Sequence, residues 1–152
     1  MGDIGDTIRK FKRLNFIKII TKILNTSRAR KYVVFLEKER LFHLGEDSNG
    51  ESLGEYHPVT VVIKQEKRQR TDHITLLDTG SFYKSFTFHA TGTDLVFDAN
   101  PIKVDEFGEE SNLFDDFGID VLGLNDADTE KLIEWIYVEL RRYLISEIWE
   151  AN

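Results

Sequence analysis

Hydrophobic residues recur at three- and four-residue intervals near the start of the chain. Lys and Arg separate them, and this spacing predicts one basic amphipathic helix from Ile4 to Leu24, with Asp3 or Asp6 near its start. A second helix is predicted from Ser27, the candidate N-cap, to Gly45. Within it, the run Val33-Val34-Phe35 would also suit a strand.

The middle of the chain changes from helical spacing to turns and short strands. Gly, Asn, Asp and Ser dominate residues 45–58 and predict a turn-rich segment. The run Val59–Ile63 predicts a strand, and the charged residues 64–72 predict a solvent-exposed loop or hairpin tip. Apolar and polar positions alternate from Phe82 to His89. This predicts a strand with one aromatic face, which returns through a turn at 91–94 to a strand at 95–97.

The last third of the chain returns to helical patterns. An acidic, Phe-rich stretch at 105–120 predicts a short helix from Glu109 to Phe117 that ends at Gly118. The N-cap candidates 125–128 then precede a long amphipathic helix. Its predicted apolar side consists of Leu132, Ile133, Ile136, Leu140, Tyr143, Leu144 and Ile148, with Trp135 and Trp149 as additional large rings.

Together these elements predict an α+β fold with N-terminal amphipathic helices, a small antiparallel sheet with a central hairpin, and a long C-terminal helix. The 152 residues suit a single domain, and no linker or repeat divides them. Within residues 1–152, the segment 1–44 is the predicted basic helical part, and 45–152 is the predicted sheet with the C-terminal helix.

Charge is distributed unevenly over the chain. Residues 1–40 hold 11 Lys and Arg against 4 Asp and Glu, and the remainder holds 9 against 23, so a basic segment precedes an acidic body of a chain with net charge −7. Such a segment can contact nucleic acid or the acidic face of another copy. Lys18 and Lys22 interrupt the apolar runs, so we expect no membrane-spanning helix and no membrane partner.

Candidate metal and cofactor sites are weak. The chain has no cysteine, and none of its 4 His residues has another His at metal-ligand spacing. Asp115, Asp116 and Asp120 fit a solvated acidic face, and the turn 47–50 lacks the spacing of a calcium loop. Because phosphate-binding glycine motifs are also missing from the sequence, we expect no cofactor and no metal.

One short segment bears directly on function. Asp78-Thr79-Gly80-Ser81 follows two apolar residues and resembles the active-site turn of an aspartic protease, in which two carboxylates share a proton. Val121-Leu122-Gly123 resembles the element that supports this turn in retroviral-type proteases, and the chain would then be a homodimer with Asp78 as catalyst. The helices predicted at both ends disagree with that nearly all-β fold. Asp-Thr-Gly is also ordinary turn chemistry.

The same segment also resembles the Thr-Gly-x-large-x-x-Ser pattern of phage tail-completion and head–tail joining proteins, the HK97-type minor tail and virion morphogenesis family. Thr79, Gly80, Phe82 and Ser85 match the motif, and Gly118 ends an acidic element as in that family. The resemblance covers about residues 40–150 and is closest to versions in phages of Bacteroides-like bacteria. The family usually has Leu-Arg where this chain has Phe82-Tyr83.

The resemblance implies a non-enzymatic virion protein, made in the host cytoplasm, that serves as one subunit of a ring at the neck or tail end. It implies head-to-tail contacts between copies and contacts with neighbouring connector, portal-side or tail-tube proteins. Non-specific contact with passing DNA is a further expectation. Two other hypotheses stay open: the Asp78 protease, and a small acidic regulatory protein that binds a host partner through its basic helix.

Overall fold

The computed structural model describes residues 4–105 and 107–150, the last two without their side chains. Asp3 and the side chain of Trp149, both named in the sequence predictions, lie outside this description. The helices are α1 (Ile4–Lys12), α2 (Phe16–Leu24), α3 (Ser27–His43), α4 (Pro58–Glu66), α5 (Ser81–Lys84), α6 (Leu113–Phe117) and α7 (Asp126–Ile145), with the short η1 (Ile119–Val121) and η2 (Ser146–Glu150). The strands are β1 (Thr87–Thr91), β2 (Asp94–Asp98), β3 (Ile102–Val104) and β4 (Glu110–Asn112).

The predicted α+β fold is confirmed, with its hairpin and its long C-terminal helix. The strands form two separate antiparallel hairpins. In the first, β1 pairs with β2 so that Phe88 lies opposite Phe97, and a tight turn at Gly92 connects them. In the second, β3 pairs with β4 so that Ile102 lies opposite Asn112.

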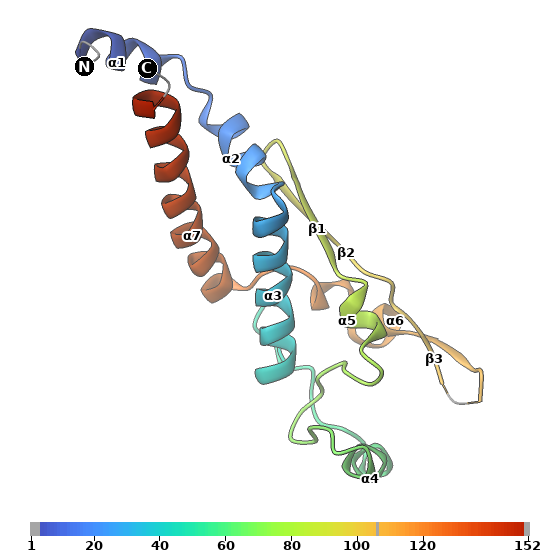
Figure 1. Ribbon diagram of the computed structural model, residues 1–152. Coiled ribbons are helices and arrows are strands. Elements are labelled where there is room, and N and C mark those ends of the chain that lie inside the picture. The colour runs from blue at the N-terminus through green and yellow to red at the C-terminus, as the bar shows by residue number, and fades with distance from the viewer. Residues whose placement is uncertain (1–3, 106, 151–152) are drawn as a thin grey trace.

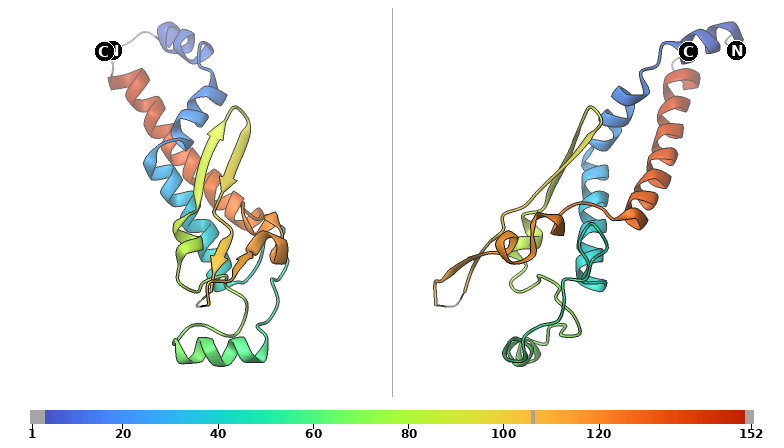
Figure 2. Two further views of the ribbon diagram at one scale, coloured as in Figure 1. Left: turned by 90° about the vertical axis from the view of Figure 1, so that its right-hand side faces the viewer. Right: turned by 180° about the vertical axis from the view of Figure 1, so that it is seen from behind.

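The molecule is elongated, with a helical body from which several elements project (Figure 1). Helices α2, α3 and α7 contact one another, and the β1–β2 hairpin lies against α2 and α3. Figure 2 shows α1 at one end of the molecule and α4 at the other, with the β3–β4 hairpin extending sideways near α4.

Two adjoining clusters form the core. One joins α2, α3, β1 and α7 through Leu24, Val33, Leu36, Phe88, Ala90 and Leu132. The other joins the end of α3 to α5 and the α6–η1 segment through Leu41, Phe82, Tyr83, Phe86, Ala99, Leu113, Val121 and Leu122. Helix α3 contributes residues to both clusters. Residues 33–35 lie within this helix, so the strand alternative for them is wrong.

The predicted helix from Ile4 to Leu24 is in fact two helices. The chain leaves α1 after Lys12, and the Asn15 side chain accepts a hydrogen bond from the Lys18 amide at 3.0 Å, which starts α2. Asn is among the preferred N-cap residues, because its side chain satisfies an otherwise unpaired amide. The cap of α3 is likewise one residue earlier than predicted: Thr26, and not Ser27, accepts from the Ala29 amide.

The predicted strand Val59–Ile63 is wrong, because these residues lie in α4. Pro58 occupies the first turn, where its missing amide hydrogen costs nothing, and the His57 ring accepts from the Val59 amide. A strand needs a neighbouring strand to pair its backbone, and no described strand pairs with this segment. Residues 64–72 are also not a plain solvent loop, since Lys64 is buried.

The predicted strand from Phe82 to His89 begins only at Thr87. Residues 81–84 form a helical turn, so Phe82 and Phe86 meet on one face with ring centroids 4.8 Å apart. Aromatic residues at positions 82, 86 and 88 fit both a strand period and a helical turn followed by a strand. Burial of Phe82 in the core favoured the second arrangement.

Two predictions in the last third were also partly wrong. The helix expected from Glu109 to Phe117 is limited to α6, because residues 110–112 pair with β3 as a strand. The N-cap of α7 falls within the predicted range, where the Asn125 side chain accepts from the Asp128 amide. Along α7, Leu132 is buried as predicted, whereas Ile133 is exposed because one residue along a helix turns a side chain by about 100°.

Candidate functional site

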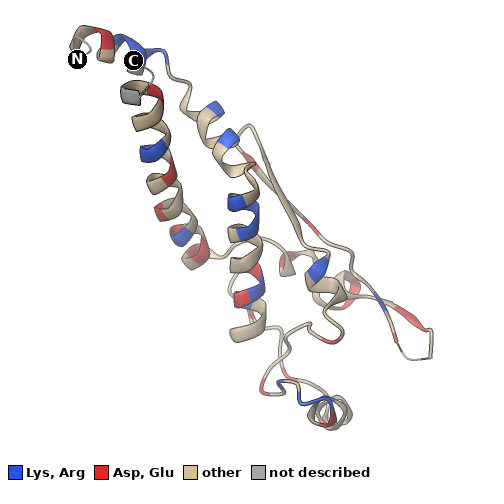
Figure 3. Cartoon of the chain, viewed as in Figure 1, with Lys and Arg blue, Asp and Glu red and all other residues tan. Residues whose placement is uncertain are grey.

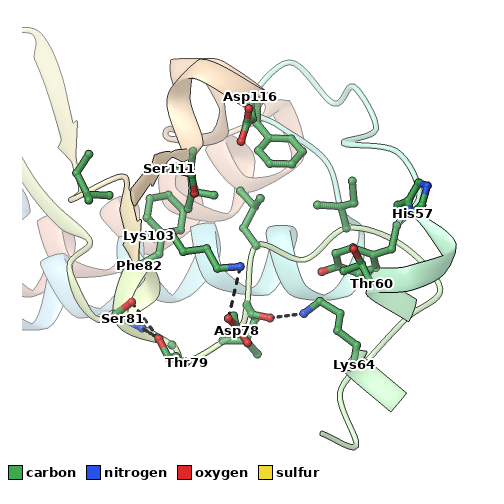
Figure 4. A pocket seen from close by; sticks show the side chains of 18 of the residues that line it. His57, Thr60, Lys64, Asp78, Thr79, Ser81, Phe82, Lys103, Ser111 and Asp116 are labelled. Atoms are coloured by element: carbon green, nitrogen blue, oxygen red, sulfur yellow. Dashed lines mark hydrogen bonds and ion pairs between the residues drawn. The ribbon is translucent and has the colours of Figure 1, made fainter. Parts of the chain in front are cut away.

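A pocket of about 310 Å³ lies beside the Asp78-Thr79-Gly80 turn (Figure 4). Helix α4 with the residues preceding it forms one side, including Tyr56, His57 and Lys64. Strand β3 and helix α6 form the other side, including Lys103 and Asp116. The predicted functional segment therefore lies where the two projecting elements, α4 and the β3–β4 hairpin, join the body.

The turn itself is held by its own backbone and side chains. Gly80 has a φ of 82°, a left-handed conformation in which a side chain would be strained, and it directly precedes α5. Thr79 Oγ1 accepts from the Ser81 amide at 3.3 Å and donates to Ser81 Oγ at 3.0 Å. Gly80 thus permits the turn of the backbone, as the sequence predicted, and the chain enters the core helix α5 directly after it.

Asp78 is paired with two lysines from different elements. Lys67 Nζ, just after α4, is 3.0 Å from Oδ1, and Lys103 Nζ, on β3, is 3.4 Å from Oδ2. Partial burial raises the pKa of Asp78, but the hydrogen bond from Lys67 and the charge of Lys103 outweigh this effect and leave the pKa below its ordinary value. The carboxylate therefore ties α4 and the β3–β4 hairpin to the turn.

The environment of Asp78 within one copy bears on the shared-proton carboxylate dyad of the protease hypothesis. A dyad needs a second carboxylate close enough to raise one of the two pKa values. In the homodimeric protease the second carboxylate would come from another copy; within one copy, two lysines lower the pKa of Asp78, and Asp116 lies across the pocket from it (Figure 4). The segment before the turn also differs from the protease pattern, since residues 74–77 are not a strand. Within one copy, the contacts of Asp78 with Lys67 and Lys103 are those of a structural ion-pair partner.

Lys64, which is buried, also connects α4 to the segment that carries Asp78. Its ammonium group donates to the Leu77 carbonyl at 2.6 Å and to Gln69 Oε1 at 3.0 Å, and it lies 4.7 Å from the centroid of the Tyr56 ring. Gln69 in turn donates to the Asp78 carbonyl at 2.8 Å. No sequence signal marked Lys64, because a charged residue at the end of an apolar run is normally solvated.

The other residues of the resemblance motif are parts of the core and its turns. Phe82 is buried among Tyr83, Phe86 and Phe114. Ser85 Oγ donates to the Phe82 carbonyl at 2.6 Å and accepts from the Asn100 amide at 2.9 Å, which connects α5 to the segment after β2. Gly118 has a φ of 78° and ends α6.

A buried charge cluster lies in α3, away from this pocket. Arg40 donates to three backbone carbonyls, those of Glu46 at 3.1 Å, Val121 at 2.9 Å and Gly123 at 2.5 Å. It is also 3.7 Å from an Asp128 carboxylate oxygen at the start of α7. Arg40 therefore fastens the loop between η1 and α7 to α3.

Glu37 completes the cluster. Its Oε1 accepts from the Gly123 amide at 2.9 Å, while Oε2 has no hydrogen-bond partner among the described residues. Burial raises the pKa of Glu37 to about 7, although the Gly123 amide and Arg40 act in the opposite direction. The sequence signal was the position of Glu37 and Arg40 on the inward side of α3, in phase with Val33 and Leu36.

The histidines are dispersed. His57 caps α4, His43 pairs with Glu39 at 3.3 Å, and His73 contacts the Phe42 carbonyl at 2.9 Å. His89 is exposed on β1. Among residues 4–105 and 107–150, no group of three or more His, Asp or Glu side chains is placed to hold a metal ion.

Charged and large apolar residues are exposed on the projecting elements, and large apolar residues are also exposed on α7 (Ile133, Tyr137, Val138, Ile145). Lys and Arg are spread along α1, α2 and the start of α3, whereas Asp and Glu lie on the β3–β4 hairpin and on α6 (Figure 3). Large apolar residues are exposed on α1 (Ile4, Ile8, Phe11), on α4 (Val59, Val62, Ile63) and on the β3–β4 hairpin (Ile102, Val104, Phe107). Within the described part of the chain, no helix has the length and apolar character needed to cross a membrane.

Comparisons of the chain with protein-family models, with curated proteins and with solved structures found no match.

Proposed function

We propose that this chain is a structural protein of a phage virion, one subunit of a ring that joins head and tail or closes the tail. The observation that carries the proposal is the exposure of large apolar side chains on three separate projecting elements, α1, α4 and the β3–β4 hairpin. Contiguous exposed apolar surface marks sites where other proteins bind. Three such surfaces on one elongated subunit suit a position with several neighbours.

The charge distribution supports the same proposal. The basic α1–α3 region and the acidic β3–β4 hairpin belong to one subunit and lie apart from each other (Figure 3). Subunits in a ring meet through different surfaces, so each copy can offer both charge signs to its neighbours. The network around Asp78 supports it further, because it fixes the direction of α4 and of the hairpin relative to the body.

The test combines particle composition with a loss-of-function phenotype. Mass spectrometry of purified particles of the phage or prophage that carries the gene should detect the chain, and electron microscopy of the purified chain should show rings. Without the chain, filled heads and separate tails should accumulate, and supplying the wild-type chain should rejoin them. Absence of the chain from particles, together with normal joining in the knockout, would refute the proposal.

The two other hypotheses give different results in the same system. A regulatory protein would be absent from particles and would be recovered in a stable complex with one host protein. If the chain is a protease, the Asp78→Asn variant should leave particle proteins uncleaved. If it has the proposed structural role, the same variant should give normal particles.

A further inference from the structure

Helix α1 has an apolar stripe that its own chain leaves exposed. Ile4, Ile8 and Phe11 follow the four- and three-residue spacing of one helix face, and Ile4 is 77% exposed. None of the residues of α1 is buried. A helix this short is marginal in water without packing, because isolated helices below about 12 residues are rarely stable. The stripe therefore requires a partner surface, and the partner must tolerate the basic residues that border it.

Basic side chains follow this stripe closely. Arg9, Lys10 and Lys12 lie in the last turn of α1, and Arg13 comes directly after it. The only acidic residue of α1 is Asp6, which pairs with Arg9. A surface that covers α1 should accordingly be apolar at its centre and acidic at its edge.

The outer face of the β3–β4 hairpin has these properties. Ile102 and Val104 project from the same face of β3, and their cross-strand partners on that face are Asn112 and Glu110. Phe107 at the tip is 85% exposed, and Glu109 follows it. Lys103, whose ammonium is paired with Asp78, projects from the opposite face, and Ile102 at the start of β3 also borders the pocket. Val104, Phe107 and Glu110, nearer the tip, do not line the pocket.

These two surfaces cannot meet within one molecule. Helix α1 lies at one end of the elongated subunit, and the β3–β4 hairpin projects from the body toward the other end (Figure 1). The helical body lies between them. A contact between α1 and a hairpin must therefore join two copies through different surfaces, which is the heterologous contact that produces a ring when the rotation closes.

We infer that α1 of one copy docks on the outer face of the β3–β4 hairpin of a second copy. The inference rests on the proposed ring function and names the contact that would hold neighbouring subunits together. The apolar stripe 4–8–11 covers Val104, Phe107 and the exposed part of Ile102, and the flanking basic residues pair with Glu110. An anionic membrane surface would also suit α1, but it would leave the apolar face of the hairpin uncovered, whereas a second copy covers both.

Two single substitutions in exposed positions test the contact. Ile8→Asp removes the centre of the stripe, and Phe107→Asp removes the centre of the hairpin surface. Each places a carboxylate in an apolar interface and should weaken association about 10- to 100-fold in sedimentation velocity measurements. Tyr137→Asp, at an exposed position of α7 outside both surfaces, is the matched control and should assemble like wild type. Circular dichroism should show that all three variants fold.

Mixing the two variants tests the direction of the contact. The Phe107→Asp copy keeps an intact α1, and the Ile8→Asp copy keeps an intact hairpin. Each variant alone should sediment as a monomer, and the equimolar mixture should form a one-to-one dimer that cannot grow, because its remaining surfaces are both defective. Rings or filaments in the mixture, or no association at all, would overturn the heterologous contact.

The outcomes separate this inference from the proposed function. If the wild-type chain is found in particles but assembly is unaffected by Ile8→Asp and Phe107→Asp, the contact is wrong and the virion role stands. If Tyr137→Asp disrupts assembly equally, the two surfaces are not specific and the contact is again wrong. A final experiment measures binding of the chain to phosphatidylserine vesicles by flotation. If the wild type binds the vesicles, Ile8→Asp does not, and assembly is the same for both, α1 is a membrane-binding helix instead.

Discussion

Replacing Glu37 with Gln should make the protein more stable at neutral and basic pH. Glu37 is 1% exposed and its pKa is raised from the ordinary value of 4.5 to about 7, chiefly by burial. Between these two values the folded state binds a proton that the unfolded state releases. The contribution of protonated Glu37 to stability is therefore complete below about pH 4.5 and is lost as the pH rises through about 7.

The size of the effect follows from the two pKa values. At about 1.4 kcal/mol per pKa unit, the difference between 4.5 and about 7 corresponds to about 3 kcal/mol of unfolding free energy. Gln is uncharged at every pH and keeps a side-chain oxygen that can accept the Gly123 amide hydrogen bond. The variant should therefore exceed the wild type by up to about 3 kcal/mol at about pH 8, and the difference should vanish near pH 4.5.

Urea unfolding of both proteins over this pH range is the assay. Glu39→Gln is the matched control, because Glu39 lies on the same helix with a solvent-exposed side chain paired with His43. The control should change stability by less than about 0.5 kcal/mol at any pH. A difference between Glu37→Gln and wild type that stays constant with pH would show that Glu37 does not take up a proton on folding, and the account of the buried cluster would be wrong.

Three further predictions concern the junction, the loop after α3 and the core. Asp78→Asn should cost about 0.5–1 kcal/mol in thermal unfolding, because it loses two partly exposed ion pairs. Because the pKa of Asp78 is lowered in the folded state, this loss of stability should be present above the ordinary pKa of Asp and disappear in stronger acid. Proteolytic activity at acidic pH in the wild type but not in Asp78→Asn would instead establish a protease. Gly45 and Gly50 both have positive φ, but a Cβ at Gly45 would clash with the His73 ring and the Ile74 carbonyl, whereas the space beside Gly50 is open. Gly45→Ala should therefore destabilise the protein in urea unfolding by about 2 kcal/mol more than Gly50→Ala. Equal costs would contradict the packing of this loop. Leu132→Ala should cost about 2–5 kcal/mol and its neighbour Ile133→Ala less than about 1 kcal/mol, and a reversed order would mean that α7 is rotated.

Much of the helical framework could be predicted from local patterns. The apolar spacing of α2, α3 and α7 and the tight turn between β1 and β2 depend on neighbouring residues, so the sequence alone indicated them. The conformation of Gly80 was predictable for the same reason, because Gly after Asp-Thr favours a positive φ. Asn15 also carried a local capping signal, but the apolar pattern on both sides of it concealed the break between α1 and α2.

The structure of residues 58–66 and 81–86 was decided by contacts with distant parts of the chain. Val59–Ile63 has strand propensity, yet it is helical because the body offers it no pairing partner, while Lys64 anchors the helix to the Leu77 carbonyl. The role of Asp78 was likewise undetermined by its motif. Its charge partners come from the end of α4 and from β3, which only the folded chain brings together.

The sequence by itself determined the α+β class, the order of the main helices and the separation of a basic start from an acidic remainder. Tertiary structure decided which charged residues are buried and which apolar residues are not. Glu37 and Arg40 are enclosed because α3 runs through the centre of the body, and Ile8 and Phe107 are exposed because their elements extend beyond it. The physical reason is that periodicity specifies the face of an element, whereas burial depends on what packs against that face.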